Sequence, residues 1–138
     1  MPRNFQHLLR VRYGECDPQG IVFNANYLLY IDVAFTELWR EAIGPWAETP
    51  KRGYDAVVAE VQLRFRSPAR FDDELAVAME IQRLGRSSIE TKATILRGEE
   101  VLIEADLRHA VLSTETWTST EMPDWIREPL AAYSSAGS

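Results

Sequence analysis

The stretch NYLLYIDVAFTELWREAI, residues 26–43, decides the fold of this chain. Its apolar side chains recur at steps of three and four residues, which is the period of one helix face. The amide side chain of Asn24 or Asn26 can cap the start. Gly44 and Pro45 end the pattern, because glycine tolerates a left-handed exit and proline cannot continue the ladder. The stretch predicts one helix of about five turns that is apolar over more than half its circumference.

Alternating apolar and polar side chains predict strands on either side of this helix. One strand precedes it at about residues 6–12, and four follow it at residues 57–66, 75–81, 89–95 and 101–111. Short connections between the last four favour antiparallel hairpins. The simplest cover for a helix that is apolar on several sides is a sheet curled around it, which is an α+β architecture. A short helix at residues 123–133 completes the prediction.

The length of 138 residues is that of one domain, which we assign to residues 1–133. The small residues 134–138 are expected to form a flexible tail. A curled sheet has two edges, and pairing one of them with a second copy would hide it. We therefore expect a homodimer, or a dimer of dimers that makes a homotetramer.

Composition argues against several classes of protein. The net charge of −6 weighs against nucleic acid, which needs a concentrated basic face. One cysteine and two histidines leave no disulfide framework and too few ligands for a zinc site, so no metal is expected. No apolar run approaches the ~18–20 residues of a membrane span, and no signal peptide is recognisable. We expect a cytoplasmic protein that binds neither nucleic acid nor membrane.

The loop ahead of the helix carries the most informative chemistry. Glu15 and Asp17 lie two residues apart, and Pro18 and Gly20 fix a bend there. A carboxylate beside a helix N-terminus suits acyl chemistry, because the exposed N–H groups and the helix dipole can stabilise an oxyanion. On spacing alone, the alternative is that Asp17 makes an Asx turn with its own backbone.

The segment RYGECDPQGIVFNANY, residues 12–27, resembles the signature of the 4-hydroxybenzoyl-CoA thioesterase family. Members of that family carry an aspartate, two residues, a glycine, two apolar residues and then an Asn-Tyr or similar pair that opens the central helix. The order of one helix and four strands extends the likeness over nearly the whole chain. The resemblance implies the hotdog fold, an antiparallel sheet wrapped around one long central helix. It also implies hydrolysis of an acyl-CoA to the free acid and CoA, where the acyl group is aromatic, such as 4-hydroxybenzoyl, or a short or medium acyl chain.

The resemblance assigns roles residue by residue. Asp17 matches the family aspartate that acts as nucleophile or general base on the thioester. The backbone N–H at Asn24 matches the group that polarises the thioester carbonyl. Gly20 and Val22, at the junction that leads into the helix, match substrate-binding positions. Tyr27, a third such position, matches the tyrosine beside the acyl pocket.

Two positions bear on the acyl group. Many family members have a histidine where this chain has Asn24, whereas the 4-hydroxybenzoyl-CoA subgroup lacks it, which leans the substrate toward an aromatic acyl group. Asp32 matches an aspartate that receives the phenolic hydroxyl in that subgroup. Its alternative role is that of a buried carboxylate bonded to backbone or to a partner subunit.

Coenzyme A is part of the substrate, and no further cofactor is expected. Arg86 and Ser87 coincide with a strand start where family members bind CoA phosphates, and Arg66 and Arg70 are alternatives. His109 lies on the apolar side of the last strand and is expected to be a hydrogen-bonded core histidine.

Other activities remain as alternatives to acyl-CoA hydrolysis. The thioester could be borne by a carrier protein, or the domain could bind acyl groups without catalysis, although a binding module would not need Asp17. Dehydration or hydration of thioesters in this fold usually places a histidine beside an acidic residue. No histidine lies within residues 11–40, which argues against that chemistry.

Overall fold

The computed structural model describes residues 3–134. In chain order the elements are β1 (Phe5–Arg10), the 3₁₀ helix η1 (Tyr13–Glu15), α1 (Ala25–Ala42), α2 (Glu48–Lys51), β2 (Tyr54–Phe65), β3 (Glu74–Leu84), β4 (Ser88–Arg97), β5 (Glu100–Ser113) and α3 (Asp124–Ala131). Among these residues, no helix is long and apolar enough to cross a membrane.

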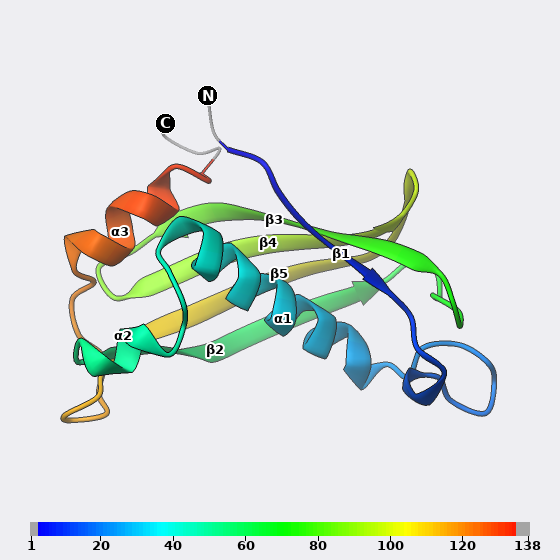
Figure 1. Cartoon of the computed structure of the whole chain (residues 1–138), viewed down its shortest axis with the longest axis horizontal. Helices are drawn as coiled ribbons and strands as arrows, with labels where there is room; N and C mark the ends of the chain where they lie inside the picture. Colours follow the sequence, from blue (N-terminus) through cyan, green and yellow to red (C-terminus); the bar gives the residue numbers. More distant parts are fainter. Residues whose placement is uncertain (1–2, 135–138) are drawn as a thin grey trace.

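The five strands form one antiparallel sheet in the order β1-β3-β4-β5-β2, with α1 lying across one face (Figure 1). β1 and β2 are therefore the edges. The loop of residues 16–24 lies at one end of the sheet, whereas α2, α3 and the β3–β4 turn lie at the other end (Figure 1). This arrangement confirms the expected α+β architecture, a sheet around one long helix.

The core lies between α1 and the sheet because both contribute apolar faces. Seven side chains of α1 are buried: Tyr27, Tyr30, Ile31, Ala34, Phe35, Leu38 and Trp39. They meet the alternately buried positions of β3 and β4, such as Val77 and Ile95. Leu29 and Val33 on the opposite side of α1 are 48% and 41% exposed. One side of the helix is therefore uncovered in the single chain.

The structure confirms the predicted end of α1 but not the predicted cap at its start. Gly44 has a φ of 145° and donates its N–H to the Trp39 carbonyl at 3.1 Å, so the predicted glycine exit is confirmed. The predicted side-chain cap is wrong. Asn24 makes no capping bond, and Asn26 lies inside the helix with its side-chain N–H donated to the Glu15 carbonyl at 2.9 Å.

The alternation predicted for residues 57–66 is interrupted in β2. The pairing of β2 with β5 shifts between Val58 and Glu60, which leaves Ala59 outside the register. Ala56 is buried ahead of the bulge, whereas Ala59 itself is exposed. Sequence alternation continues through the bulge although the strand faces change there, so the prediction of one unbroken apolar face is wrong.

The chain end is held against the sheet as far as it is described. Ser134 is buried and forms an isolated parallel bridge with Ile81, so the expected flexible tail does not begin there. The rest of that tail, residues 135–138, lies outside the described residues.

Candidate active site

The Asp17 loop is a tight turn closed by main-chain hydrogen bonds. An isolated bridge pairs Cys16 with Val22, and the Asp17 N–H donates to the Ile21 carbonyl at 2.8 Å. The Gly20 N–H donates to the Asp17 carbonyl at 2.9 Å, and Gly20 has a φ of 81°, a conformation that glycine adopts without strain. The loop therefore holds Asp17 in a defined place.

The carboxylate of Asp17 has one engaged oxygen and one open oxygen. Its Oδ1 accepts the Gln19 N–H at 2.8 Å, which is the Asx turn that spacing alone allowed. Within residues 3–134, Oδ2 accepts no hydrogen bond, and the side chain is half-buried. The turn geometry therefore orients the carboxylate and leaves one oxygen available for chemistry.

Glu15 anchors this loop to α1. Its buried carboxylate accepts hydrogen bonds of 2.8 Å each from the Arg12 N–H, the Arg12 guanidinium and the Tyr30 hydroxyl. Burial acts to raise the pKa of Glu15, but these donors outweigh it and the pKa lies below its ordinary value. The carbonyl of Glu15 also receives the Phe23 N–H at 2.9 Å. The side chain and the backbone carbonyl of Glu15 thus both hold the loop that leads into α1.

The start of α1 offers unpaired main-chain donors. Asn24 is already helical, with φ −54° and ψ −34°. In the described part of the chain, the N–H groups of Asn24 and Ala25 donate to no acceptor, as is normal for a first helical turn. Together with the helix dipole, they form a site for a developing negative charge.

A pocket of about 280 Å³ opens at this helix start. It is lined by Ile21, Val22, Asn24, Tyr27, Phe65, Arg66, Ser67 and Pro68. The hydroxyl of Tyr27 accepts the Ala69 N–H at 3.0 Å, and burial is the main cause of the raised pKa of this phenol. The structure thus brings Val22, Asn24 and Tyr27 together beside the Asp17 loop.

Asp32 and His109 share a second pocket, of about 440 Å³, between α1, Trp46 and the first half of β2. Asp32 is exposed in the single chain, so its alternative role as a buried carboxylate would need a partner subunit to cover it. His109 is buried, but its Nδ1 has no hydrogen-bond partner among the described residues, so the expected hydrogen-bonded histidine is wrong as well. A histidine does stand beside α1, although none lies within residues 11–40.

The candidate phosphate ligands fall at opposite ends of the molecule. Arg86 and Ser87 lie in the β3–β4 turn, away from the Asp17 loop of the same chain (Figure 1). Arg66 lines the pocket beside Asn24 and pairs with Glu104 at 2.9 Å. Arg70 pairs with Ile21 through a main-chain bridge, and its guanidinium has no ion pair among the described residues.

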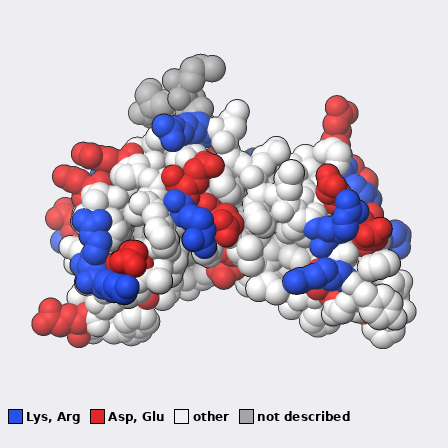
Figure 2. All heavy atoms as spheres, viewed as in Figure 1, with Lys and Arg blue, Asp and Glu red and all other residues white. Residues whose placement is uncertain are grey.

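Charged groups at the Asp17 end are intermingled rather than gathered by sign (Figure 2). Arg10 pairs with Glu74 at 2.9 Å, and Arg12 is held by Glu15. These two arginines are therefore already paired with carboxylates, whereas Arg70 next to the loop has no ion pair within residues 3–134.

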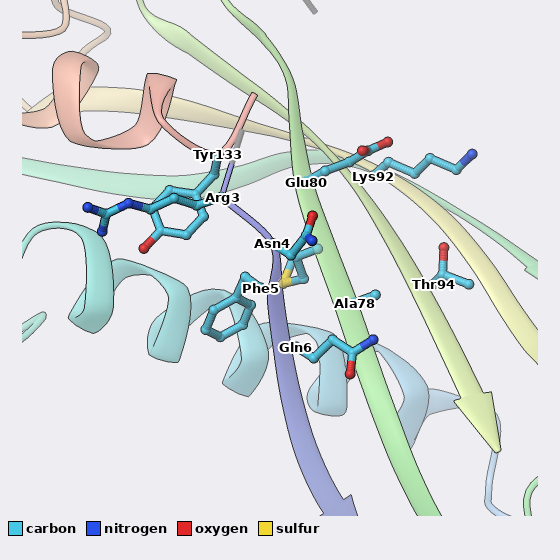
Figure 3. Close-up of a pocket in the computed structure, with 10 residues that line it drawn as sticks. Arg3, Asn4, Phe5, Gln6, Ala78, Glu80, Lys92, Thr94 and Tyr133 are labelled. Atoms are coloured by element: carbon cyan, nitrogen blue, oxygen red, sulfur yellow. The ribbon is translucent and has the colours of Figure 1, made fainter. Parts of the chain in front are cut away.

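A larger hollow, of about 710 Å³, lies across β1, β3 and β4 (Figure 3). Arg3, Glu80, Lys92 and Tyr133 give it a mixed polar lining. It contains neither the Asp17 loop nor the start of α1. Its size alone therefore does not make it the candidate for acyl chemistry.

Sequence reasoning missed three parts of these sites. The anchor between Glu15 and Tyr30 joins residues fifteen positions apart. The wall at residues 65–68 and the ring of His109 reach α1 from strands far along the chain. The local signals for the second pocket were Asp32 on the helix and a histidine at an apolar strand position.

A family model and several relatives of known name all match this chain as thioesterases. The model of the thioesterase superfamily matches residues 19–104, a segment that includes Asn24, Tyr27 and Asp32 and begins two positions after Asp17. The acyl-CoA thioester hydrolase YbgC of Escherichia coli O157:H7 is 27% identical over 99 residues, covering 72% of this chain and 74% of the relative. The 4-hydroxybenzoyl-CoA thioesterase of Pseudomonas sp. (strain CBS-3) is 28% identical over 100 residues, covering 70% and 71%.

Solved structures share the fold over nearly the full length. A hypothetical protein from Thermus thermophilus superposes with a TM-score of 0.87 and 26% identity, covering 93% of this chain and 98% of that one. A probable thioesterase from Bartonella henselae superposes with a TM-score of 0.80 and 24% identity, covering 88% and 100%. These solved structures thus share the arrangement of an antiparallel sheet around one helix.

Proposed function

The chain belongs to the thioesterase superfamily and is a thioester hydrolase, and we propose that it hydrolyses an acyl-CoA to the free acid and CoA with Asp17 as its catalytic carboxylate. The main support for this proposal is that an open carboxylate oxygen and open N–H groups belong to neighbouring parts of the chain. Asp17 has an unbonded Oδ2, and the neighbouring start of α1 has unbonded N–H groups. A nucleophile or base beside an oxyanion donor is what thioester hydrolysis requires.

In the proposed reaction the carbonyl oxygen of the thioester accepts the N–H of Asn24. As the carbonyl carbon becomes tetrahedral, its oxygen gains negative charge, which this donor and the helix dipole stabilise. The new C–O bond forms either from Asp17 itself or from a water that Asp17 deprotonates. The C–S bond then breaks, and the CoA thiolate takes up a proton. On the Asp17 route, water finally cleaves the acyl–aspartate anhydride.

Arg70 is our candidate for the CoA phosphates. It lies beside Ile21 on the rim of the Asp17 loop, and its guanidinium is unpaired in the described structure. Arginine binds phosphate through a planar set of donors, so an unpaired one is the better ligand. Arg86 and Ser87 would have to act from another subunit, because their turn lies at the other end of the chain.

We further propose that the active form is a dimer joined along β2. This strand is a sheet edge, and it exposes Val58 and Phe65 at 42% and 56%. Twofold pairing of β2 with its copy is antiparallel, so the Phe65 end of one strand meets the Tyr54 end of the other. The pocket at Asn24 would then face the partner's pocket of Asp32 and His109. Sedimentation tests this assembly, and a monomer at micromolar concentration would contradict it.

The experiment for the catalytic assignment is a thiol-release assay on aromatic, short and medium acyl-CoAs. Asp17→Asn suits this test because the amide oxygen can still accept the Gln19 N–H and keep the turn. We expect the rate to fall about 10²–10⁴-fold, as for loss of a general acid or base. Asp124→Asn, the same charge change at the exposed start of α3, is the control and should keep full activity. Wild-type rates in Asp17→Asn would refute the assignment.

A further inference from the structure

His109 is placed in the wall of the second pocket by an aromatic stack. Its ring lies on the ring of Phe35 with centroids 3.9 Å apart and planes 8° apart. Only 3% of the residue is exposed. Trp46 and Val58 complete the apolar part of the pocket, and Asp32 supplies a carboxylate. A polar ring thus stands among apolar walls.

The nitrogens of this ring have no partners in the described structure. Nδ1 is fully enclosed and makes no hydrogen bond. Nε2 also makes none, yet it is not enclosed, so it is the nitrogen that meets the pocket. Buried polar atoms are nearly always paired, and leaving one unpaired is costly. Nδ1 cannot meet a ligand, so His109 offers the pocket a single open nitrogen, Nε2, with which a ligand can form a hydrogen bond.

The protonation of the ring follows from its surroundings. Burial lowers the pKa of His109 to about 4, so the ring is neutral at neutral pH and carries one N–H. A proton on Nδ1 would be enclosed without an acceptor, whereas a proton on Nε2 can reach a ligand. The pocket therefore presents one neutral donor.

Asp32 provides the opposite kind of group. Its side chain is exposed and accepts no hydrogen bond within residues 3–134, since the bond from Thr36 goes to its backbone carbonyl. The pocket thus combines a donor and an acceptor with the aromatic lining of Phe35 and Trp46. A hydroxyl accepts one hydrogen bond and donates another, so an aromatic hydroxyl suits both groups at once.

We propose that His109 is a specificity-determining residue, whose Nε2–H donates to a hydroxyl oxygen on an aromatic acyl group while Asp32 accepts the hydroxyl proton. This inference rests on the proposed thioesterase function and on the proposed β2 dimer, in which the pocket of Asp32 and His109 faces the Asn24 pocket of the other subunit. The family resemblance already matches Asp32 to an aspartate that receives a phenolic hydroxyl. The new assignment is His109 on β5, which lies outside the segment matched by the superfamily model. The benzoyl ring itself needs only the apolar walls.

Two substitutions distinguish the contribution of the N–H donor from that of the aromatic ring. His109→Phe keeps an aromatic ring on Phe35 but removes the donor, and His109→Gln loses the ring but keeps a terminal N–H. The kcat/KM of each variant is measured on benzoyl-CoA, 3-hydroxybenzoyl-CoA and 4-hydroxybenzoyl-CoA. We expect His109→Phe to lower kcat/KM about tenfold to a hundredfold on the preferred hydroxylated substrate, with benzoyl-CoA within about threefold of wild type. His109→Gln should recover part of the preference.

The outcomes separate this inference from the function on which it rests. If wild type hydrolyses benzoyl-CoA and His109→Phe affects all three substrates alike, the role of His109 is refuted and the hydrolase stands. If wild type releases no CoA from any acyl-CoA, the proposed function fails. Calorimetric titration with 4-hydroxybenzoate and benzoate then decides the role of His109. An equal preference in wild type and His109→Phe would overturn it, and a preference lost in the variant would support it.

Discussion

The hydroxyl of Tyr30, in the second turn of α1, donates a 2.8 Å hydrogen bond to Oε1 of Glu15, two residues ahead of Asp17. This bond joins the central helix to the loop that carries the proposed catalytic carboxylate. Because Glu15 is buried and negatively charged, each of its donors supports both the local fold and the position of the loop.

Tyr30→Phe removes one donor from this carboxylate and leaves the ring in place. We expect a loss of about 1–3 kcal/mol in the free energy of unfolding, measured by urea denaturation. The kcat/KM should also fall, because the loop becomes less firmly held. Tyr54→Phe is the matched control, since no hydrogen bond of the Tyr54 hydroxyl occurs among the described residues. Equal stability of Tyr30→Phe and wild type would show that the bond contributes nothing.

The stability contributed by Glu15 should depend on pH in a defined direction. Its pKa in the folded protein lies below the ordinary value of 4.5, so the unfolded chain takes up a proton more readily. The contribution is therefore complete above pH 4.5 and is lost as the pH falls through the folded pKa. Thermal unfolding of wild type and Glu15→Gln tests this. The difference in Tm should narrow as the pH is lowered below 4.5, and a constant difference would contradict it.

The buried His109 should make the stability of the fold depend on pH in a second, higher range. Its pKa falls from 6.5 to about 4 on folding, so the unfolded chain binds more protons between these values. Stability should decrease as the pH is lowered from 6.5 toward 4. His109→Phe lacks this titration, so its stability should vary less than that of wild type over the same range. If the free energy of unfolding changed equally with pH in the two proteins between pH 6.5 and 4, a neutral buried imidazole would be contradicted.

The sequence predicts the elements of this fold well because each has a strong local period. The helix of residues 26–43 and the observed Ala25–Ala42 differ by one residue at each end. The bulge at Ala59 was not predictable in the same way, because apolar alternation continues across it while the pairing with β5 shifts. Local patterns specify elements, and partner strands decide where they deviate.

The same distinction between local and distant partners applies to the candidate sites. Asp17, Asn24 and Tyr27 belong to one continuous segment, so their proximity could be expected from the sequence. The stack of His109 on Phe35 joins residues on β5 and α1, and no local pattern indicates it. Glu15 was visible as a carboxylate, but its role depends on Tyr30, which lies fifteen residues further along the chain in α1.

The proposed oxyanion donor is a main-chain group, so substitutions that change only the side chain should not reveal it. Asn24→Ala removes the amide side chain, which makes no capping bond, and should keep kcat within about threefold of wild type. Asn24→Pro removes the N–H itself. The φ of −54° at this position suits proline, and in the described structure the N–H holds no other element in place.

We therefore expect Asn24→Pro to fold and to lose about 10²–10³-fold in kcat, the usual effect of removing one oxyanion donor. Circular dichroism and Tm of both variants establish that they are folded before rates are compared. An Asn24→Pro protein that is folded and fully active would exclude this N–H as the donor. The neighbouring N–H of Ala25 would then be the remaining unpaired donor of the first turn, and Ala25→Pro would test it in the same assay.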